Sequence, residues 1–165
     1  MAEIVHPLGN KTTADSQNEW IRNISYEDIN GEGRLFGGRL MEWIDEVAGV
    51  CAIRHCQSYV TTAAVDNLIF KHGAVLNDIL VIVAKVTYVG NTSLEVRVDT
   101  YVEDVKSGLR SPINRAYVTE VSIDDEGHPQ TVPFGLTLSG PGEEAEWEAA
   151  KKRIALRKQR RLEGF

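Results

Sequence analysis

At 165 residues with 42% hydrophobic content, the chain is long enough for one domain with a substantial core. A net charge of −6, with no basic patch interleaved with aromatic residues, argues against a nucleic-acid partner. The longest apolar run, 79–84, is too short to cross a bilayer, and the N-terminal sequence has no signal-peptide pattern. Cys51 and Cys56 are poorly spaced for a disulfide or a metal site. We therefore expect reduced thiols in a cytoplasmic protein, with no membrane partner and no metal.

The first half of the chain is organised around one helix. Residues 1–19 are polar and are predicted to be a flexible segment, and a short strand is predicted from Trp20 to Ser25. Seven apolar residues after the glycine-rich loop have the spacing of a buried helical stripe: Leu40, Met41, Ile44, Val47, Ala48, Cys51 and Ala52. Asp45 falls about 20° beyond the edge of that stripe. Burial at such a boundary raises the pKa of a carboxylate, which makes Asp45 a candidate base.

The predicted helix begins without a capping side chain. Phe36-Gly37-Gly38 leads directly into it, where Ser, Thr, Asp or Asn is usual. The first backbone N–H groups are then free to bind an acceptor from a ligand, and the glycines allow that ligand to approach closely. Alternatively, the glycine pair only forms a tight turn against a strand. Asn30 before the pair and Asp45 after it favour the ligand site.

Four long strands are predicted after this helix: Tyr59 to Phe70, Ile79 to Val89, Leu94 to Glu103 and Ile113 to Ile123. A last short extended piece begins at 131–133, and Gly140-Pro141-Gly142 ends the domain, which we place at 20–142. This order is typical of an α+β fold, and such long strands imply a strongly curved antiparallel sheet wrapped around the central helix.

Residues 143–165 have a distinct charge pattern. They carry 7 basic and 5 acidic side chains, with the acids first and most of the bases later. That arrangement complements a helix dipole. We predict a charged C-terminal helix on the surface of the domain, starting at Glu143.

The sequence of the central loop and helix also resembles the signature of a known protein family. Asn30-Gly31, Gly33, Phe36-Gly37-Gly38, Leu40-Met41 and Asp45 together resemble the signature of the hotdog-fold acyl-CoA thioesterases. The similarity is greatest to the bacterial short- and medium-chain acyl-CoA hydrolases and the brain-type acyl-CoA hydrolase. In that group an Asn seven residues before the glycine pair and an acid seven residues after its second glycine form the active site. Asn30 and Asp45 have both spacings. The similarity continues through 65–66, 89–93 and 125–133.

The resemblance implies a hotdog fold and an enzyme that hydrolyses acyl-CoA to free CoA and a carboxylic acid. Asp45 would be the general base or the nucleophile. Asn30 would hold the water or the substrate, and the Gly38 N–H would polarise the thioester carbonyl. No cofactor is implied, because coenzyme A is part of the substrate.

The resemblance also implies substrate contacts and an assembly. The contacts are expected at the helix start and at the turn along the pantetheine and phosphate path: Phe36, Gly37, Gly90, Asn91, Thr92 and Ser93. Many relatives carry a basic residue or His after the glycine of that turn, where this chain has Asn. The candidates for phosphate-binding cations are therefore Lys71, Arg110 and Arg115. In the family the Asn and the acid meet across a dimer interface, so we expect a homodimer within a hexamer, as a trimer of dimers.

Several alternatives stay open at this point. Asn30 could be only a turn residue in an Asn-Gly step, and Asp45 could pair with a neighbouring Arg. His55 and Cys56 are adjacent on a helix, so their side chains diverge and a structural role is favoured. A non-catalytic acyl-CoA-binding sensor module is the alternative function. A hotdog dehydratase would need a His paired with a carboxylate, and the loop and first turns of the central helix contain no His.

Overall fold

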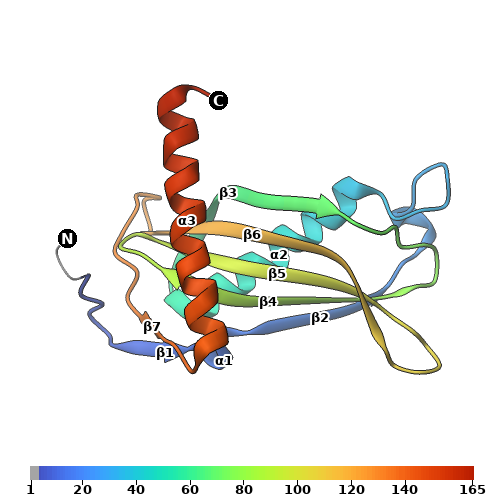
Figure 1. Ribbon diagram of the computed structural model, residues 1–165, viewed down its shortest axis with the longest axis horizontal. Helices are drawn as coiled ribbons and strands as arrows, with labels where there is room; N and C mark the ends of the chain where they lie inside the picture. The colour runs from blue at the N-terminus through green and yellow to red at the C-terminus, as the bar shows by residue number, and fades with distance from the viewer. Residues whose placement is uncertain (1–3) are drawn as a thin grey trace.

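The computed structural model describes residues 4–165, which form a five-stranded antiparallel sheet with a long helix on each face (Figure 1). The strands, in spatial order, are β2 (Asn18–Asn23), β4 (Ile79–Val89), β5 (Ser93–Glu103), β6 (Arg110–Ile123) and β3 (Tyr59–Phe70). Helix α2 (Gly37–Cys56) contacts all five strands, and α3 (Pro141–Glu163) crosses the strands on the other face (Figure 1). This confirms the predicted α+β architecture.

The core lies between α2 and the sheet. Six of the seven apolar residues predicted to form the buried stripe of α2 are buried, and Met41, at 48% exposed, is the exception. They pack against apolar side chains of the central strands, such as Leu80, Val86 and Val96. Trp43 is also buried, with the guanidinium of Arg22 stacked 4.0 Å from the centre of its ring. Burial of this apolar surface is the main source of stability.

Residues 4–19 are more ordered than their composition suggests, and residues 1–3 of the predicted flexible segment lie outside the described residues. Within residues 1–19, expected to be flexible, lie β1 (Asn10–Thr12) and α1 (Thr13–Ser16). Strand β1 pairs in parallel with β7 (Gly135–Thr137), and Thr13 and Ser16 are buried. The order therefore comes from pairing with the far end of the domain, which local composition does not reveal. A short 3₁₀ helix, η1 (Tyr26–Asp28), precedes the Asn30 loop.

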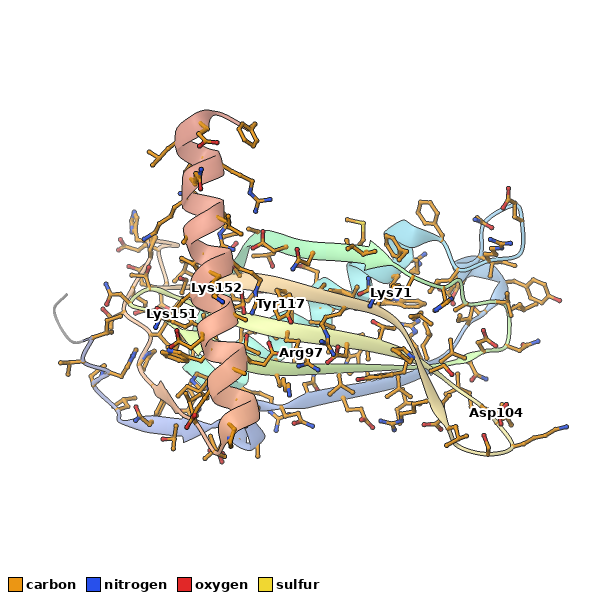
Figure 2. The ribbon with its side chains drawn as sticks, in the orientation of Figure 1. Lys71, Arg97, Asp104, Tyr117, Lys151 and Lys152 are labelled. Atoms are coloured by element: carbon orange, nitrogen blue, oxygen red, sulfur yellow. The ribbon has the colours of Figure 1, made fainter. Side chains whose placement is uncertain are left out.

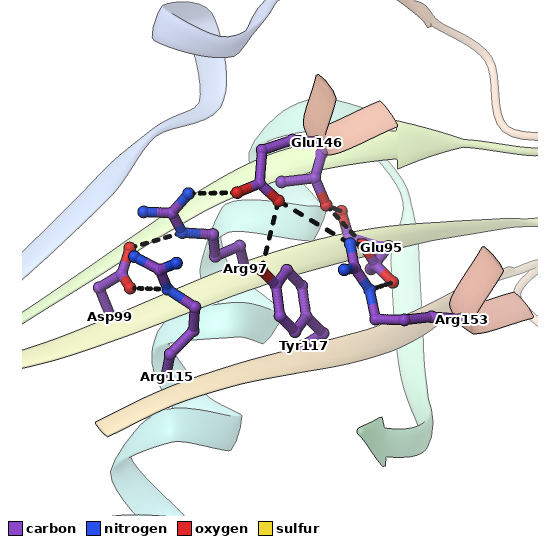
Figure 3. Close-up of polar contacts among 8 residues, drawn as sticks. Glu95, Arg97, Asp99, Arg115, Tyr117, Glu146 and Arg153 are labelled. Carbon is purple, nitrogen blue, oxygen red and sulfur yellow. Dashed lines mark hydrogen bonds and ion pairs between the residues drawn. The ribbon is translucent and has the colours of Figure 1, made fainter. Parts of the chain in front are cut away.

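Helix α3 lies on the surface of the domain, as predicted, and covers one face of the sheet (Figure 1). Beneath it, the carboxylate of Glu95 is 2% exposed and accepts hydrogen bonds from Arg153 at 2.7 and 2.9 Å. Arg97 donates to both Asp99 and Glu146, as Figure 3 shows. The buried charges on this face of β5 need partners of opposite charge, because an unpaired buried charge is costly. Helix α3 supplies these partners as Arg153 and Glu146.

Strand β3 is at one edge of the sheet and β2 is at the other. The pairing of β3 with β6 shifts register between Thr62 and Ala64. On one side of the shift, the Thr62 hydroxyl bonds to Asp45 of α2. On the other side, the Asp66 carboxylate pairs with Arg157 and Arg160 of α3. Strand β3 is therefore attached to both helices while its outer edge stays unpaired within residues 4–165.

Candidate active site

The loop before α2 is held in shape by Asn30. Its Oδ1 accepts the N–H groups of Glu32 and Arg34, at 3.0 and 3.1 Å, and its backbone N–H donates to the carbonyl of Arg34 at 2.7 Å. Asn30 therefore does stabilise the turn, as the alternative reading of the Asn-Gly step predicted. The Nδ2 group of Asn30 has no acceptor within residues 4–165, and the side chain is exposed. Asn30 can thus offer hydrogen-bond donors to a ligand, whereas its acceptor is already engaged.

The N-terminus of α2 is uncapped, as predicted. Phe36 is the N-cap residue and makes no capping hydrogen bond through its side chain. The N–H groups of Gly37 and Gly38 have no acceptor in the described part of the chain. A Cβ on Gly38 would lie 2.6 Å from the Phe36 ring, so a larger residue would displace that ring. A cavity of about 440 Å³ opens here, lined by Asn30, Gly37, Phe70, Lys71, His72 and Gly73 among others.

Asp45 lies on the exposed side of α2, about 10 Å along the axis from the glycine pair. The Thr62 hydroxyl donates to Oδ1 of Asp45 at 2.6 Å. The same hydroxyl oxygen lies 3.1 and 3.3 Å from the two carboxylate oxygens of Glu120. No basic side chain pairs with Asp45 among residues 4–165, so the alternative of an Arg partner is not realised. Asp45, Thr62 and Glu120 line an open cavity of about 390 Å³.

Glu120 has an unusual environment for a carboxyl group. Its side chain is completely buried, and this burial raises its pKa to about 7. The nearby charge of Asp45 also raises the pKa, while the contact with the Thr62 hydroxyl lowers it. Sequence reasoning missed both Thr62 and Glu120. The available signal was a Glu inside the apolar strand 113–123, but its proximity to Asp45 depends on the pairing of β3 with β6.

The predicted phosphate-binding cations differ in their availability. Arg110 is engaged by Glu19 at 3.0 Å and by Glu103 at 2.9 Å. Arg115 donates to Asp99 at 2.5 Å. Lys71 has no carboxylate partner in the described chain, and Figure 2 shows it at the end of the sheet away from α3. Of these three candidates, Lys71 alone lines the same cavity as Asn30 and makes no ion pair within residues 4–165.

The turn 90–93 lies in a different place. It closes the β4–β5 hairpin, with the Gly90 N–H donating to the Ser93 carbonyl at 2.7 Å. Gly90, Asn91, Thr92 and Ser93 line a third cavity, of about 410 Å³, together with residues of α3. Within one chain, therefore, the helix start, Asp45 and this turn belong to three separate cavities.

The other nucleophilic and basic side chains have structural positions. Cys51 and Cys56 are free and buried, and burial raises the pKa of each thiol to about 12. The buried His55 ring contacts the Ser16 hydroxyl at 3.1 Å and the Phe134 carbonyl at 3.2 Å. Burial lowers its pKa, so the ring is neutral. Residues 4–165 contain no cluster of side chains able to hold a metal ion, and none of their helices could span a membrane.

Comparisons with known proteins agree with this architecture. A family model described as the thioesterase superfamily matches residues 32–108. An acyl-CoA hydrolase variant from Staphylococcus aureus, solved in complex with coenzyme A, is 34% identical and superposes with a TM-score of 0.88. The superposition covers 93% of this chain and 92% of that one, and it confirms the predicted hotdog fold. An apo-hexameric acyl-CoA thioesterase is 32% identical, with a TM-score of 0.86 over 92% of this chain and 96% of that one.

The curated relatives are longer than the region they share with this chain. An uncharacterized acyl-CoA thioester hydrolase of Bacillus subtilis is 36% identical over 106 residues, which are 64% of this chain and 62% of that protein. The cytosolic acyl coenzyme A thioester hydrolase of Mus musculus is 31% identical over 166 residues, which are 96% of this chain and 43% of that protein. The chain thus spans less than two thirds of the length of either relative.

Proposed function

Since the chain belongs to the thioesterase superfamily, we propose that it hydrolyses acyl-CoA thioesters to free coenzyme A and a carboxylic acid. The observation that carries this proposal is the carboxylate of Asp45, held at 2.6 Å by the Thr62 hydroxyl in an open cavity beside α2. A thioesterase needs such a carboxylate to activate water or to attack the thioester carbon. The uncapped start of α2 supplies the second requirement, which is a donor for the developing oxyanion.

Each residue then has a distinct role. Asp45 is the general base or the nucleophile. The Gly38 N–H, at the positive end of the helix dipole, polarises the thioester carbonyl. The free Nδ2 group of Asn30 donates to the substrate or to the attacking water.

The relatives support this choice of residues. In variants of the Staphylococcus aureus hydrolase an Asn, an Asp and a Thr are replaced, and these are separated by 15 and 17 residues. Asn30, Asp45 and Thr62 have the same two intervals.

The site is completed by a second copy of the chain. Asn30 and Asp45 line different cavities in one chain, whereas two α2 helices running antiparallel would bring Asp45 of one copy beside the glycine pair of the other. The exposed sides of α2 and β3 carry apolar side chains that such a contact would cover: Met41, Val50, Ile53, Val65 and Phe70. The unpaired edge of β3 would be covered as well. The hexameric relative agrees with a homodimer inside a larger assembly.

Glu120 positions the reactive carboxylate. A hydroxyl has one proton, and the Thr62 hydroxyl uses it to donate to Asp45. Glu120 is close to the Thr62 oxygen, so only a protonated Glu120 can complete the interaction, by donating to that oxygen. The chain of donors then runs from Glu120 through Thr62 to Asp45, and it fixes the orientation of the Asp45 carboxylate. The groups of α2 that face Glu120 are Asp45, Cys51 and Cys56.

A panel of acyl-CoA substrates, including butyryl-CoA, tests the proposal by release of free thiol. Asp45→Asn should lower kcat about 10²–10⁴-fold without changing the thermal unfolding temperature, because Asp45 is exposed. Glu46→Gln is the matched control, since Glu46 is the next exposed acid on the same helix. Tight acyl-CoA binding with no turnover by the unmodified protein would instead support the sensor module. Full activity of Asp45→Asn would contradict the assignment of the base.

A further inference from the structure

Asp28 is a buried carboxylate at the start of the loop that carries Asn30. It is the last residue of η1 and is 2% exposed. Its Oδ2 accepts hydrogen bonds from the backbone N–H and the hydroxyl of Ser25, at 2.9 and 2.7 Å. Its Oδ1 lies 3.5 Å from Nε of Arg39, which is the third residue of α2. The two oxygens thus join the start of the loop to the first turn of the helix.

The backbone of Asp28 closes the same loop. Its carbonyl accepts the N–H of Phe36, the residue before α2, at 2.8 Å. One step further into the loop, Ile29 and Leu35 form an antiparallel bridge. Asn30 follows directly, so the position of its side chain depends on this short ladder. The placement of Asn30 relative to the start of α2 is therefore set by the closure at Asp28.

Asp28 is ionised in the fold. Burial by itself raises the pKa of this carboxyl group, but the hydrogen bonds from Ser25 and the charges of Arg22 and Arg39 lower the pKa more. A buried carboxylate needs such partners, because an unpaired buried charge is strongly unfavourable. The attraction between Asp28 and Arg39 therefore favours one placement of the first turn of α2 relative to the loop.

This attachment leaves the backbone donors of the helix start free. A carboxylate beside a helix N-terminus commonly accepts the unpaired N–H groups there. Asp28 makes no such bond, since its side-chain oxygens contact Ser25 and Arg39 instead. The N–H groups of Gly37 and Gly38 keep no acceptor within residues 4–165. The helix start is thus tied to the loop by a side chain while its donors stay available to a ligand.

We propose that Asp28 is a positioning residue, which holds the donors of Asn30 and of the glycine pair in one geometry; the proposal rests on the proposed function. Asn30 and Gly37 line the same cavity, so their donors can act on one thioester group. Such donors stabilise the charge that develops in the transition state. A displacement of about 1 Å can cost about 10²-fold in rate. Loss of the Asp28 charge should therefore lower kcat and leave KM nearly unchanged.

Asp28→Asn tests this role with the acyl-CoA that the unmodified protein hydrolyses fastest. The amide keeps the size and can still accept from Ser25, but it lacks the charge that attracts Arg39. The variant should show kcat lowered about 10–100-fold, with KM changed less than about threefold. Asp15→Asn is the matched control, since Asp15 of α1 accepts the same two kinds of hydrogen bond from Thr12, and it should retain kcat. Circular dichroism of each variant measures the folded fraction and separates unfolding from a loss of rate.

Arg39→Gln removes the same contact from the helix side. It keeps the hydrogen bonds between Ser25 and Asp28, so it decides the role even if Asp28→Asn does not fold. Its kcat should fall by a similar factor. The double variant Asp28→Asn/Arg39→Gln should lose no more than the larger single effect, because both changes break one contact. Glu42→Gln removes the other ion pair of Arg39 and should leave kcat unchanged.

The outcomes separate this role from the proposed function. Unchanged kcat in Asp28→Asn and Arg39→Gln, with hydrolysis by the unmodified protein, would overturn the positioning role alone. Losses that multiply in the double variant would also overturn it, because the two residues would then act independently. A rise in KM with kcat unchanged would do the same, since the loop would then only bind substrate. Absence of hydrolysis in the unmodified protein would contradict the proposed function and the role of Asp28 with it.

Discussion

The hydroxyl of Thr62, on the edge strand β3, donates a hydrogen bond to Oδ1 of Asp45, on the central helix, at 2.6 Å. The same hydroxyl oxygen lies 3.1 Å from Oε1 of the buried Glu120, which in our proposal donates to it when protonated. In our proposal the Asp45 carboxylate is therefore oriented by a second carboxyl group to which it makes no direct hydrogen bond.

The protonation of Glu120 should appear in the pH dependence of both activity and stability. Its pKa in the fold is raised from an ordinary 4.5 to about 7, so the folded state holds its proton longer than the unfolded state. The contribution of Glu120 to the free energy of unfolding is present below pH 4.5 and is lost as the pH rises to about 7. Activity should also fall above about pH 7, where Glu120 can no longer donate to Thr62.

Glu120→Gln provides the measurement for this prediction. The amide keeps a donor toward Thr62 but does not titrate. The variant should retain activity, lose the decline in activity above neutral pH, and show a flatter dependence of unfolding free energy between pH 4.5 and 7. Glu120→Ala should lose activity at every pH. If Glu120→Gln reproduces the pH profile of the unmodified protein, Glu120 does not position Asp45.

The shared site predicts complementation between inactive variants. Asp45→Ala and Asn30→Ala should each be folded and each lose most activity, because each site would take one residue from each copy. Mixing them under subunit exchange should restore part of the activity, since some hybrid dimers regain one intact site. Native mass spectrometry would establish that hybrids form. Hybrids without any recovered activity would place the complete site within a single chain.

A charge introduced on the exposed side of α2 should prevent the pairing of two copies. Met41 is 48% exposed and lies one helical turn before Asp45. Met41→Lys should shift sedimentation toward a monomer at micromolar concentration, because the lysine would be desolvated in the contact. The control is Val105→Lys in the loop between β5 and β6, where Val105 is 75% exposed. Equal sedimentation of the two variants would mean that this face of α2 stays open to solvent.

Removal of Arg153 should destabilise the fold strongly. Glu95 is 2% exposed, and Arg153 donates two hydrogen bonds to it while stacking 3.5 Å from the centre of the Tyr117 ring (Figure 3). Arg153→Ala leaves a buried carboxylate without its cation, which typically costs about 3–5 kcal/mol. Lys152→Ala on the same helix is the exposed control. The measurement is urea unfolding. Adding Glu95→Gln to Arg153→Ala should recover part of the loss, and no recovery would show that packing of Arg153 dominates.

Local patterns in the sequence predicted a large part of this fold. The bounds of β3 and β4 were predicted to the residue, because apolar runs and flanking turn residues define them. Strands β2, β5 and β6 and helix α3 begin one to three residues earlier than predicted. The pairing of β1 with β7 was missed, since it joins opposite ends of the domain. Asp45 and the uncapped helix start were predicted from the pattern of the loop and helix, and Asn30 was predicted from the family resemblance. Thr62 and Glu120 were not, because only strand pairing brings them to Asp45.

The register shift in β3 has a consequence for how this strand can change. Thr62 and Asp66 are four residues apart, so regular alternation would point both to one face. The shift between Thr62 and Ala64 reverses the alternation, and Thr62 turns toward α2 while Asp66 turns toward α3. Loss of the single residue Ala63 would remove the bulge but leave Thr62 and Asp66 three positions apart, so regular alternation would still point them to opposite faces. A strand of the present length without the shift could serve the Asp45 cavity or anchor α3, but not both. The contacts with the two helices therefore make β3 tolerant of a one-residue deletion at the bulge and intolerant of a regular strand of the same length.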